Sequence, residues 1–223
     1  MIVKAANIEL SPESPRYEGG SWHVEGMQNE AIVATVIAYL HAENITESKL
    51  AFRYSLDECI EYEQGDDHGV EVLYGLEDGD PLNEHAGEVT CAAGRVICFP
   101  NTMQHRVQPF ELADASKPGR RKIVVFFIVD PTKRITSTRT VPPQQLSWWR
   151  DVVRLDRKFP RDVVPYIEKH VEFPLSRAAA EEHRLELMQE RSVAADAIDE
   201  TYYEEEFSLC EREGCTVLIR VFA

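Results

Sequence analysis

The sequence predicts a mainly β protein with a helical C-terminal part, and three observations support this. Residues 1–140 contain short runs of β-branched and aromatic residues separated by turn signals such as Gly19-Gly20 and Lys117-Pro118-Gly119. Residues from Pro142 onward show helical spacing of apolar side chains. The length of 223 residues suits one folded core with an appendage at most. We therefore expect a sandwich or jelly roll at 1–140 and helices at 141–223 that pack on it.

The expected strands follow one another along the first part of the chain. Their bounds are Ile2–Leu10, Ile32–Leu40, Leu50–Tyr54, Val70–Tyr74, Val96–Phe99 and Lys122–Val129. Both faces of the last strand are apolar, which indicates a central position in its sheet. Cys98 stands inside the preceding strand, and we expect it to be a buried small apolar residue.

Two helices are expected after the strands. Pro142-Pro143 can begin one that continues to about Leu155, because proline is favoured at the first helical position. Ser176 is a suitable N-cap for a longer helix that runs to about Phe207. We expect Trp148-Trp149 to pack on the sheet rather than to form a binding surface.

Composition and charge exclude several classes of function. The apolar fraction of 43% is that of a globular protein, and the net charge of −15 argues against nucleic acid as a partner. The N-terminus lacks the apolar stretch of a signal peptide, and no apolar run is long enough to span a membrane. The cysteines show no CxxC spacing, so we expect reduced thiols in a cytoplasmic protein. They are Cys59, Cys91, Cys98, Cys210 and Cys215.

Three side chains are candidates for a metal site. His23 and Glu25 stand two residues apart, and such residues point to the same face of a strand. His105 follows the apolar run that ends at Phe99. Two histidines and one carboxylate form the facial triad of non-heme Fe(II) oxygenases. The residue pattern also allows a simpler interpretation, in which these are surface or structural residues at strand edges.

Arg121 is the fourth candidate. It shares one face of the last strand with Ile123, Val125 and Phe127, so its guanidinium points the same way as core residues and needs an anionic partner. A fixed cation near a metal suits a dicarboxylate co-substrate. On spacing alone, Arg121 can equally belong to the solvated end of the strand.

Other candidates have simpler interpretations. His68 and His85 flank four aspartates in a Gly-rich segment, which a solvated acidic loop explains better than a second metal site does. The chain contains no GxSxG, P-loop or GxGxxG context, which argues against hydrolase, NTPase and dinucleotide-binding functions.

One stretch resembles a known superfamily. The segment His105-Arg106-Val107-Gln108-Pro109, followed by Gly119-Arg120-Arg121 and the apolar strand to Asp130, is similar to the core of 2-oxoglutarate/Fe(II)-dependent oxygenases, particularly the prolyl-hydroxylase-like branch. The resemblance implies a double-stranded β-helix (jelly roll) in which His23, Glu25 and His105 bind Fe(II) and Arg121 binds 2-oxoglutarate. It implies an enzyme that uses O₂ to oxidise, typically hydroxylate, a C–H bond of a small-molecule substrate.

Longer strings resemble a large, mostly uncharacterised family of fungal proteins over nearly the whole chain. They include Tyr17–Met27, Ala42–Ser48, Phe110–Asp114 and Val141–Gln145. Members of that family are usually much longer, with an N-terminal region that this sequence does not include, and the sequence is compatible with a short natural form as well as with a shortened one. The sequence departs from the oxygenase pattern in having Glu25 where aspartate is usual.

Two alternatives stay open. A cupin-like metal enzyme that does not use 2-oxoglutarate is disfavoured, because Glu25 replaces the second histidine of the cupin HxH pattern. A non-catalytic interaction module is disfavoured by the intact set of three ligands. The sequence neighbours of the metal site that could face a substrate are Trp22, Met27, Gln28 and Gln104.

Overall fold

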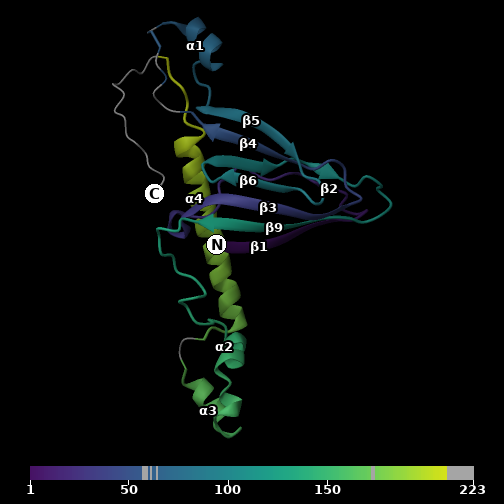
Figure 1. Ribbon diagram of the computed structural model, residues 1–223, viewed down its shortest axis with the longest axis vertical. Helices are drawn as coiled ribbons and strands as arrows, with labels where there is room; N and C mark the ends of the chain where they lie inside the picture. Colours follow the sequence, from purple (N-terminus) through teal and green to yellow (C-terminus); the bar gives the residue numbers. More distant parts are fainter. Residues whose placement is uncertain (57–59, 61, 64, 172–173, 210–223) are drawn as a thin grey trace. The chain divides into compact units, whose positions relative to one another are not determined.

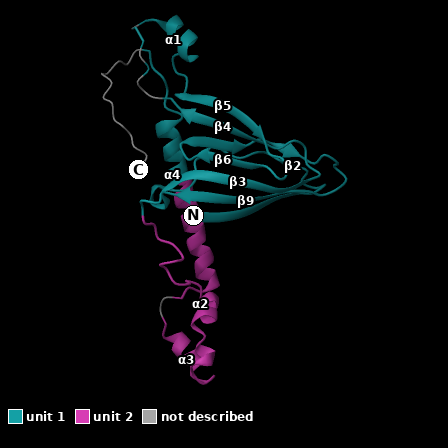
Figure 2. Cartoon of the chain, viewed as in Figure 1, with its two compact units in different colours: residues 1–133, 194–223 teal, residues 134–193 magenta. Residues whose placement is uncertain are grey.

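The computed structural model describes residues 1–56, 60, 62–63, 65–171 and 174–209. It divides into two compact units, residues 1–133 with 194–223 and residues 134–193 (Figure 2). The domain boundary expected between residues 140 and 141 stays a prediction, and so does the packing of the helical part on the β core. Cys59, Cys210 and Cys215 lie outside the described residues.

The first unit contains a four-stranded antiparallel sheet with the order β1-β9-β3-β6 (Figure 1). The expected central position of the last long strand is confirmed, because β9 pairs with β1 on one side and β3 on the other. The bounds are β1 (Ile2–Leu10), β3 (Ile32–Glu43), β6 (Val96–Pro100) and β9 (Gly119–Val129).

A second antiparallel sheet has the order β5-β4-β7, and a short pair joins β2 to β8. The bounds are β2 (Arg16–Tyr17), β4 (Lys49–Ser55), β5 (Asn83–Thr90), β7 (Met103–Val107) and β8 (Phe110–Glu111), with a 3₁₀ turn at Gln28–Glu30. The sequence prediction included neither β5 nor β7, because their polar side chains lack the apolar alternation of a typical strand.

One hydrophobic core joins the two sheets. Its buried members come from β3, β4, β6 and β9, with one residue just after β5, and they are Ile37, Tyr39, Leu50, Phe52, Cys91, Phe99, Val125 and Phe127. Mainly β content, antiparallel sheets and a shared core are consistent with a β-sandwich, as expected.

The strand expected at Val70–Tyr74 is wrong. This segment lies in α1 (Asp67–Tyr74), whose first turn is capped by the Asp66 side chain accepting from the Gly69 N–H, 2.9 Å apart. Gly75 ends the helix with φ of 66°. Only Val70 of this helix is buried, in a small cluster with Leu76 and Leu82. The stabilisation of the helix by its capping groups therefore outweighs the β-strand propensity of the β-branched residues in this segment.

Cys98 is exposed, contrary to the expected burial. The strand β6 alternates, with Phe99 buried and Ile97 partly buried on one face, and Val96 and Cys98 on the other. Cys91 is buried instead, and both thiols are free.

The second unit is helical. It contains α2 (Leu146–Val153), a 3₁₀ turn at Leu155–Arg157, α3 (Val164–Lys169) and the first turns of α4 (Arg177–Tyr202). Within it, Trp149 is buried and Trp148 is 57% exposed, and Arg150 binds Glu168 through two hydrogen bonds. No helix in the described residues is both long enough and apolar enough to cross a membrane.

The last turn of α4 is fixed to the three-stranded sheet by a buried arginine. Arg53 on β4 donates to Asp199 at 2.7 Å, to Glu204 at 2.6 Å and to the Gln104 side chain at 2.6 Å. Its side chain is 5% exposed, whereas those of the two carboxylates are 32% and 44% exposed. The charge is thus fully paired, and the carboxylates keep some contact with water.

We expect the Arg53→Ala protein to lose about 3 kcal/mol of unfolding free energy, the low end of the range for a buried pair, because the carboxylates left behind are partly exposed; chemical denaturation measures the loss. The substitution leaves two neighbouring carboxylates without their cation. Arg120→Ala is the matched control, because Arg120 also pairs with a carboxylate, Glu43, but at an exposed site, where about 1 kcal/mol or less is expected. Equal losses in the two variants would contradict the structural importance of Arg53.

Candidate metal centre

The structure brings His23, Glu25 and His105 together. His23 and His105 form an antiparallel bridge, in which each backbone N–H donates to the carbonyl of the other at 3.2 and 3.0 Å. Glu25 Oε1 lies 3.5 Å from His105 Nε2 and 3.9 Å from His23 Nε2. One ligand atom from each residue lies within 4.8 Å of the others, so the three side chains can bind a single ion.

The backbone assigns the tautomer of His23. Its Nδ1 lies 2.9 Å from the Ser21 carbonyl, which can only accept, so Nδ1 carries the proton. The lone pair is then on Nε2, the atom that faces Glu25. This arrangement, with one ring nitrogen bound to a carbonyl and the other free to coordinate, is the usual one for a metal-binding histidine.

Ring packing, together with the contact between Nε2 and Glu25, orients His105. Its side chain is 4% exposed, and its ring centroid lies 4.7 Å from that of Phe99 and 4.4 Å from that of His23. In the described residues, His105 Nδ1 has no hydrogen-bond partner. The apolar contacts therefore hold Nε2 toward Glu25.

The electrostatics of the cluster favour the protonation states that a metal needs. Burial lowers the pKa of His23, and the neighbouring His105 lowers it further. Burial by itself raises the pKa of Glu25, but hydrogen bonding and positive charge from His105 outweigh it, so the pKa of this carboxyl lies below its usual value. Near neutral pH the site thus offers a neutral imidazole and a carboxylate.

Asn101 positions Glu25. Its Oδ1 accepts from the Glu25 N–H at 2.9 Å, and its Nδ2 donates to the carbonyls of Glu25 at 2.9 Å and Ile32 at 3.1 Å. Sequence reasoning did not identify this asparagine as a site residue. Its role depends on contacts between distant segments, which no local pattern encodes.

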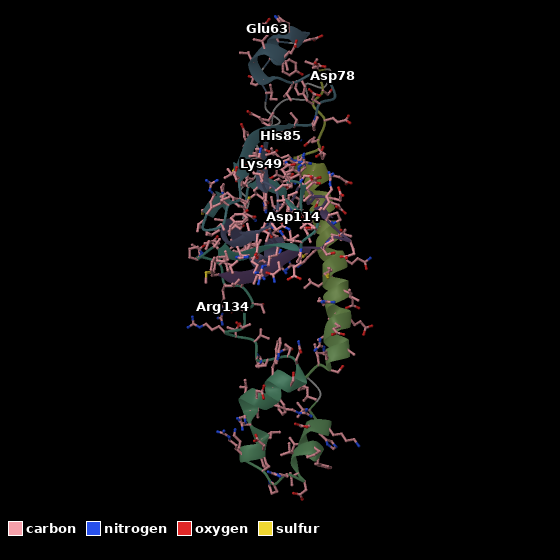
Figure 3. The ribbon with its side chains drawn as sticks, turned by 90° about the vertical axis from the view of Figure 1, so that its right-hand side faces the viewer. Lys49, Glu63, Asp78, His85, Asp114 and Arg134 are labelled. Atoms are coloured by element: carbon pink, nitrogen blue, oxygen red, sulfur yellow. The ribbon has the colours of Figure 1, made fainter. Side chains whose placement is uncertain are left out.

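Trp22 holds the chain next to His23. Its ring lies between two guanidinium groups, with Arg106 at 4.5 Å and Arg53 at 4.9 Å from the ring centroid. His85, which is labelled in Figure 3, packs edge-on against the same ring. Trp22 is thereby a packing residue. Gln104, another expected substrate neighbour, is also a buried structural residue, because its amide binds Arg53 and Asp199.

Arg121 is buried on the core face of β9, as its strand face predicted. The residue is 3% exposed, and its guanidinium lies over the rings of Tyr39 and Phe110, with centroids 5.4 and 5.5 Å away. It donates to the Ser48 hydroxyl at 2.6 Å. Its described partners include no carboxylate, so a buried positive charge lacks a counter-ion.

The neighbouring Arg120 differs in its surroundings. It points to the opposite side of the strand, is exposed, and binds Glu43 through Nε and Nη2 at 3.1 and 2.9 Å. Of the two adjacent arginines, only Arg121 faces the core and remains available for an anionic ligand.

No second metal cluster occurs among the residues that the structure describes. Within the described part of the chain, His23, Glu25 and His105 are the one group of three neighbouring His, Cys, Asp or Glu side chains that could hold an ion. His68 is exposed and lies 3.9 Å from Glu71 of the same helix. The acidic segment is thus better explained by its local capping bonds than by a metal.

Residues 1–152 match the family described as protein of unknown function (DUF4246). The chain belongs to this family. The match includes every candidate site residue, since His23, Glu25, His105 and Arg121 all lie within it. The search of curated proteins found no match.

Among solved structures, the DUF4246 chain is similar to hydroquinone 1,2-dioxygenase PnpCD, a structure determined with Cd²⁺ and 4-hydroxybenzonitrile. The identity is 16% and the TM-score is 0.29, over 60% of this chain and 61% of the other. The chain thus spans less than two thirds of that protein's length. A similarity this weak does not show an activity for this chain.

Proposed function

We propose that the protein is an Fe(II)- and 2-oxoglutarate-dependent oxygenase that oxidises a C–H bond of a small molecule. The observation that carries this proposal is a His/Glu/His cluster in the same sandwich as a buried arginine whose described partners include no carboxylate. The cluster suits a divalent metal with open coordination positions, and the arginine suits a dicarboxylate.

The order of the strands supports a jelly roll for this core. One sheet is β1-β9-β3-β6, and the other continues from the bridge at His23 to β7, β4 and β5. Two packed sheets of four antiparallel segments are typical of jelly rolls. In this arrangement, His105 on β7 and Arg121 on β9 belong to facing sheets.

The separation between Arg121 and the metal cluster is relevant to a five-carbon dicarboxylate, which would contact both. Ser48, which contacts Arg121, immediately precedes β4, and Phe52 on β4 is paired with His105. Four residues of extended chain span about 13 Å. Arg121 and His105 are both buried, each 3% exposed. The buried Thr35 hydroxyl, which has no described hydrogen-bond partner, is a further polar group in this interior.

Each residue has a defined task under this proposal. His23, Glu25 and His105 hold the metal, while Arg121 and Ser48 bind the distal carboxylate of 2-oxoglutarate. The phenylalanines around His105 exclude water. The bound iron supplies the oxidising chemistry, in which 2-oxoglutarate, O₂ and R–H give succinate, CO₂ and R–OH.

The first test needs no primary substrate. Without O₂, protein loaded with Fe(II) should develop a visible charge-transfer band when 2-oxoglutarate is added, because the keto acid then chelates the iron. We expect saturation at one equivalent of each, and slow succinate formation after air is admitted. Glutarate, which lacks the keto group, is the matched control and should give no band. Iron binding without any band would favour a cupin-like enzyme that does not use 2-oxoglutarate.

A further inference from the structure

A cavity of about 630 Å³ adjoins Glu25 within the first unit. The segment from Val24 to Val33 and the last part of α4 supply most of its lining. Ala194, Ile198 and Tyr202 of α4 line it, and their spacing of four residues places them on one helix face. Neither the metal ligands His23 and His105 nor Arg121 line this space. It is therefore distinct from the interior that we assign to the co-substrate.

The polar groups of the lining are largely used within the protein. All three hydrogen bonds of the Asn101 amide go to backbone atoms. The Tyr203 hydroxyl donates to the Thr102 carbonyl at 2.8 Å, and Asp130 accepts from Thr132. What remains toward the cavity is mainly the hydrocarbon surface of Met27, Ile32 and the α4 face.

We propose that this cavity binds the molecule to be oxidised, and that this molecule is small, neutral and predominantly apolar. The proposal rests on the function proposed above, because Glu25 is what places the cavity beside the metal. Its volume lies in the range of small-molecule sites. The lining includes two carboxylates, Glu25 and Asp130, and one ammonium group, Lys133, so neither sign of charge is favoured for the ligand. Gln28 and Lys133 also line the cavity, but most of its surface is apolar, so binding would depend mainly on burial of apolar surface.

The test uses N-phenyl-1-naphthylamine, a neutral apolar dye whose fluorescence increases when it leaves water. We expect saturable binding at about one site in the parent protein. Ile198→Trp should weaken it at least about tenfold, because the larger ring fills the cavity. Val193→Trp is the matched control: Val193 also lies on α4, but it is 64% exposed and does not line the cavity. Its dye affinity should equal that of the parent.

Displacement of the dye tests the chemical class. In a series of straight-chain alcohols, each added methylene should strengthen displacement by about fourfold until the cavity is full. Glutarate and 2-oxoglutarate should not displace it. Displacement by the dicarboxylates, or equal dye binding in the Ile198→Trp and parent proteins, would overturn the inference.

The proposal for the metal site and the proposal for the cavity can be contradicted separately. The Ile198→Trp protein should keep metal binding and the 2-oxoglutarate band, since Ile198 touches neither proposed site. A protein that binds metal and 2-oxoglutarate but no dye would overturn this inference alone. A protein that binds dye but no metal would overturn the proposed function, and with it the assignment of the apolar ligand as a substrate.

Discussion

The His105→Ala protein is expected to bind Fe(II), Mn(II) or Co(II) at least about 100-fold more weakly than the parent, which should bind one equivalent. The substitution removes one of only two imidazoles in the cluster, and Glu25 lies 3.5 Å from the nitrogen that is lost. Titration calorimetry with Mn(II) or Co(II), and anaerobic dialysis followed by elemental analysis for iron, measure the effect.

Two further variants separate ligand loss from unfolding. Since His105 packs against Phe99, alanine leaves a gap at this site. Glu25→Gln keeps the size of the side chain and removes only its charge, so weak metal binding by this variant in a normally folded protein has no packing explanation. His183→Ala, at an exposed histidine that pairs with Glu186, should bind metal like the parent. Undiminished metal content in both His105→Ala and Glu25→Gln would end the metal-site assignment.

Arg121→Ala is expected to weaken 2-oxoglutarate binding by about 2–4 kcal/mol, the range for loss of one partner from a desolvated charge pair. The guanidinium is 3% exposed, and its described partners are one hydroxyl and two rings, so nothing else nearby would replace its charge. The midpoint of the anaerobic charge-transfer titration gives this affinity, provided that iron binding is measured separately and is unchanged.

Arg121→Lys and Arg120→Ala are the informative comparisons. Lysine keeps the positive charge but lacks the planar guanidinium that can form two parallel hydrogen bonds with a carboxylate. An intermediate affinity for 2-oxoglutarate is therefore expected. Arg120 points to solvent and binds Glu43, so its removal should change 2-oxoglutarate affinity little. If Arg120→Ala has the larger effect, Arg121 does not bind the co-substrate, and the anion site lies on the outer face of β9.

Sequence patterns were sufficient where the local chain controls the outcome. Period-two alternation in β9 put Arg121 on one face with Ile123, Val125 and Phe127, and the structure buries Arg121 on that face while Arg120 is exposed. The apolar character of both faces correctly indicated a central strand. The same logic failed at Val70–Tyr74, because the caps at Asp66 and Gly75 favour a helix over the β-branched residues between them.

Strand pairing determined features of the fold that the local residue pattern could not predict. The strand β7 carries His105, yet its sequence is too polar to indicate a strand, and pairing with β4 and the bridge from His23 are what make it extended. Cys98 faces outward because β6 is an edge strand whose other face covers the core. Strand order and the identity of the neighbouring strand depend on contacts far apart in sequence, so the residue pattern alone leaves them open.

By itself, the sequence determined which chemical groups are available: a His-x-Glu pair, a distant histidine, and an arginine at the start of a core strand. Only the tertiary structure decided that three of them converge within 4.8 Å, that Asn101 fixes Glu25, and that the arginine is buried with no described carboxylate partner. The physical reason is that side-chain direction follows local backbone geometry, whereas convergence and burial follow from how the sheets pair and pack.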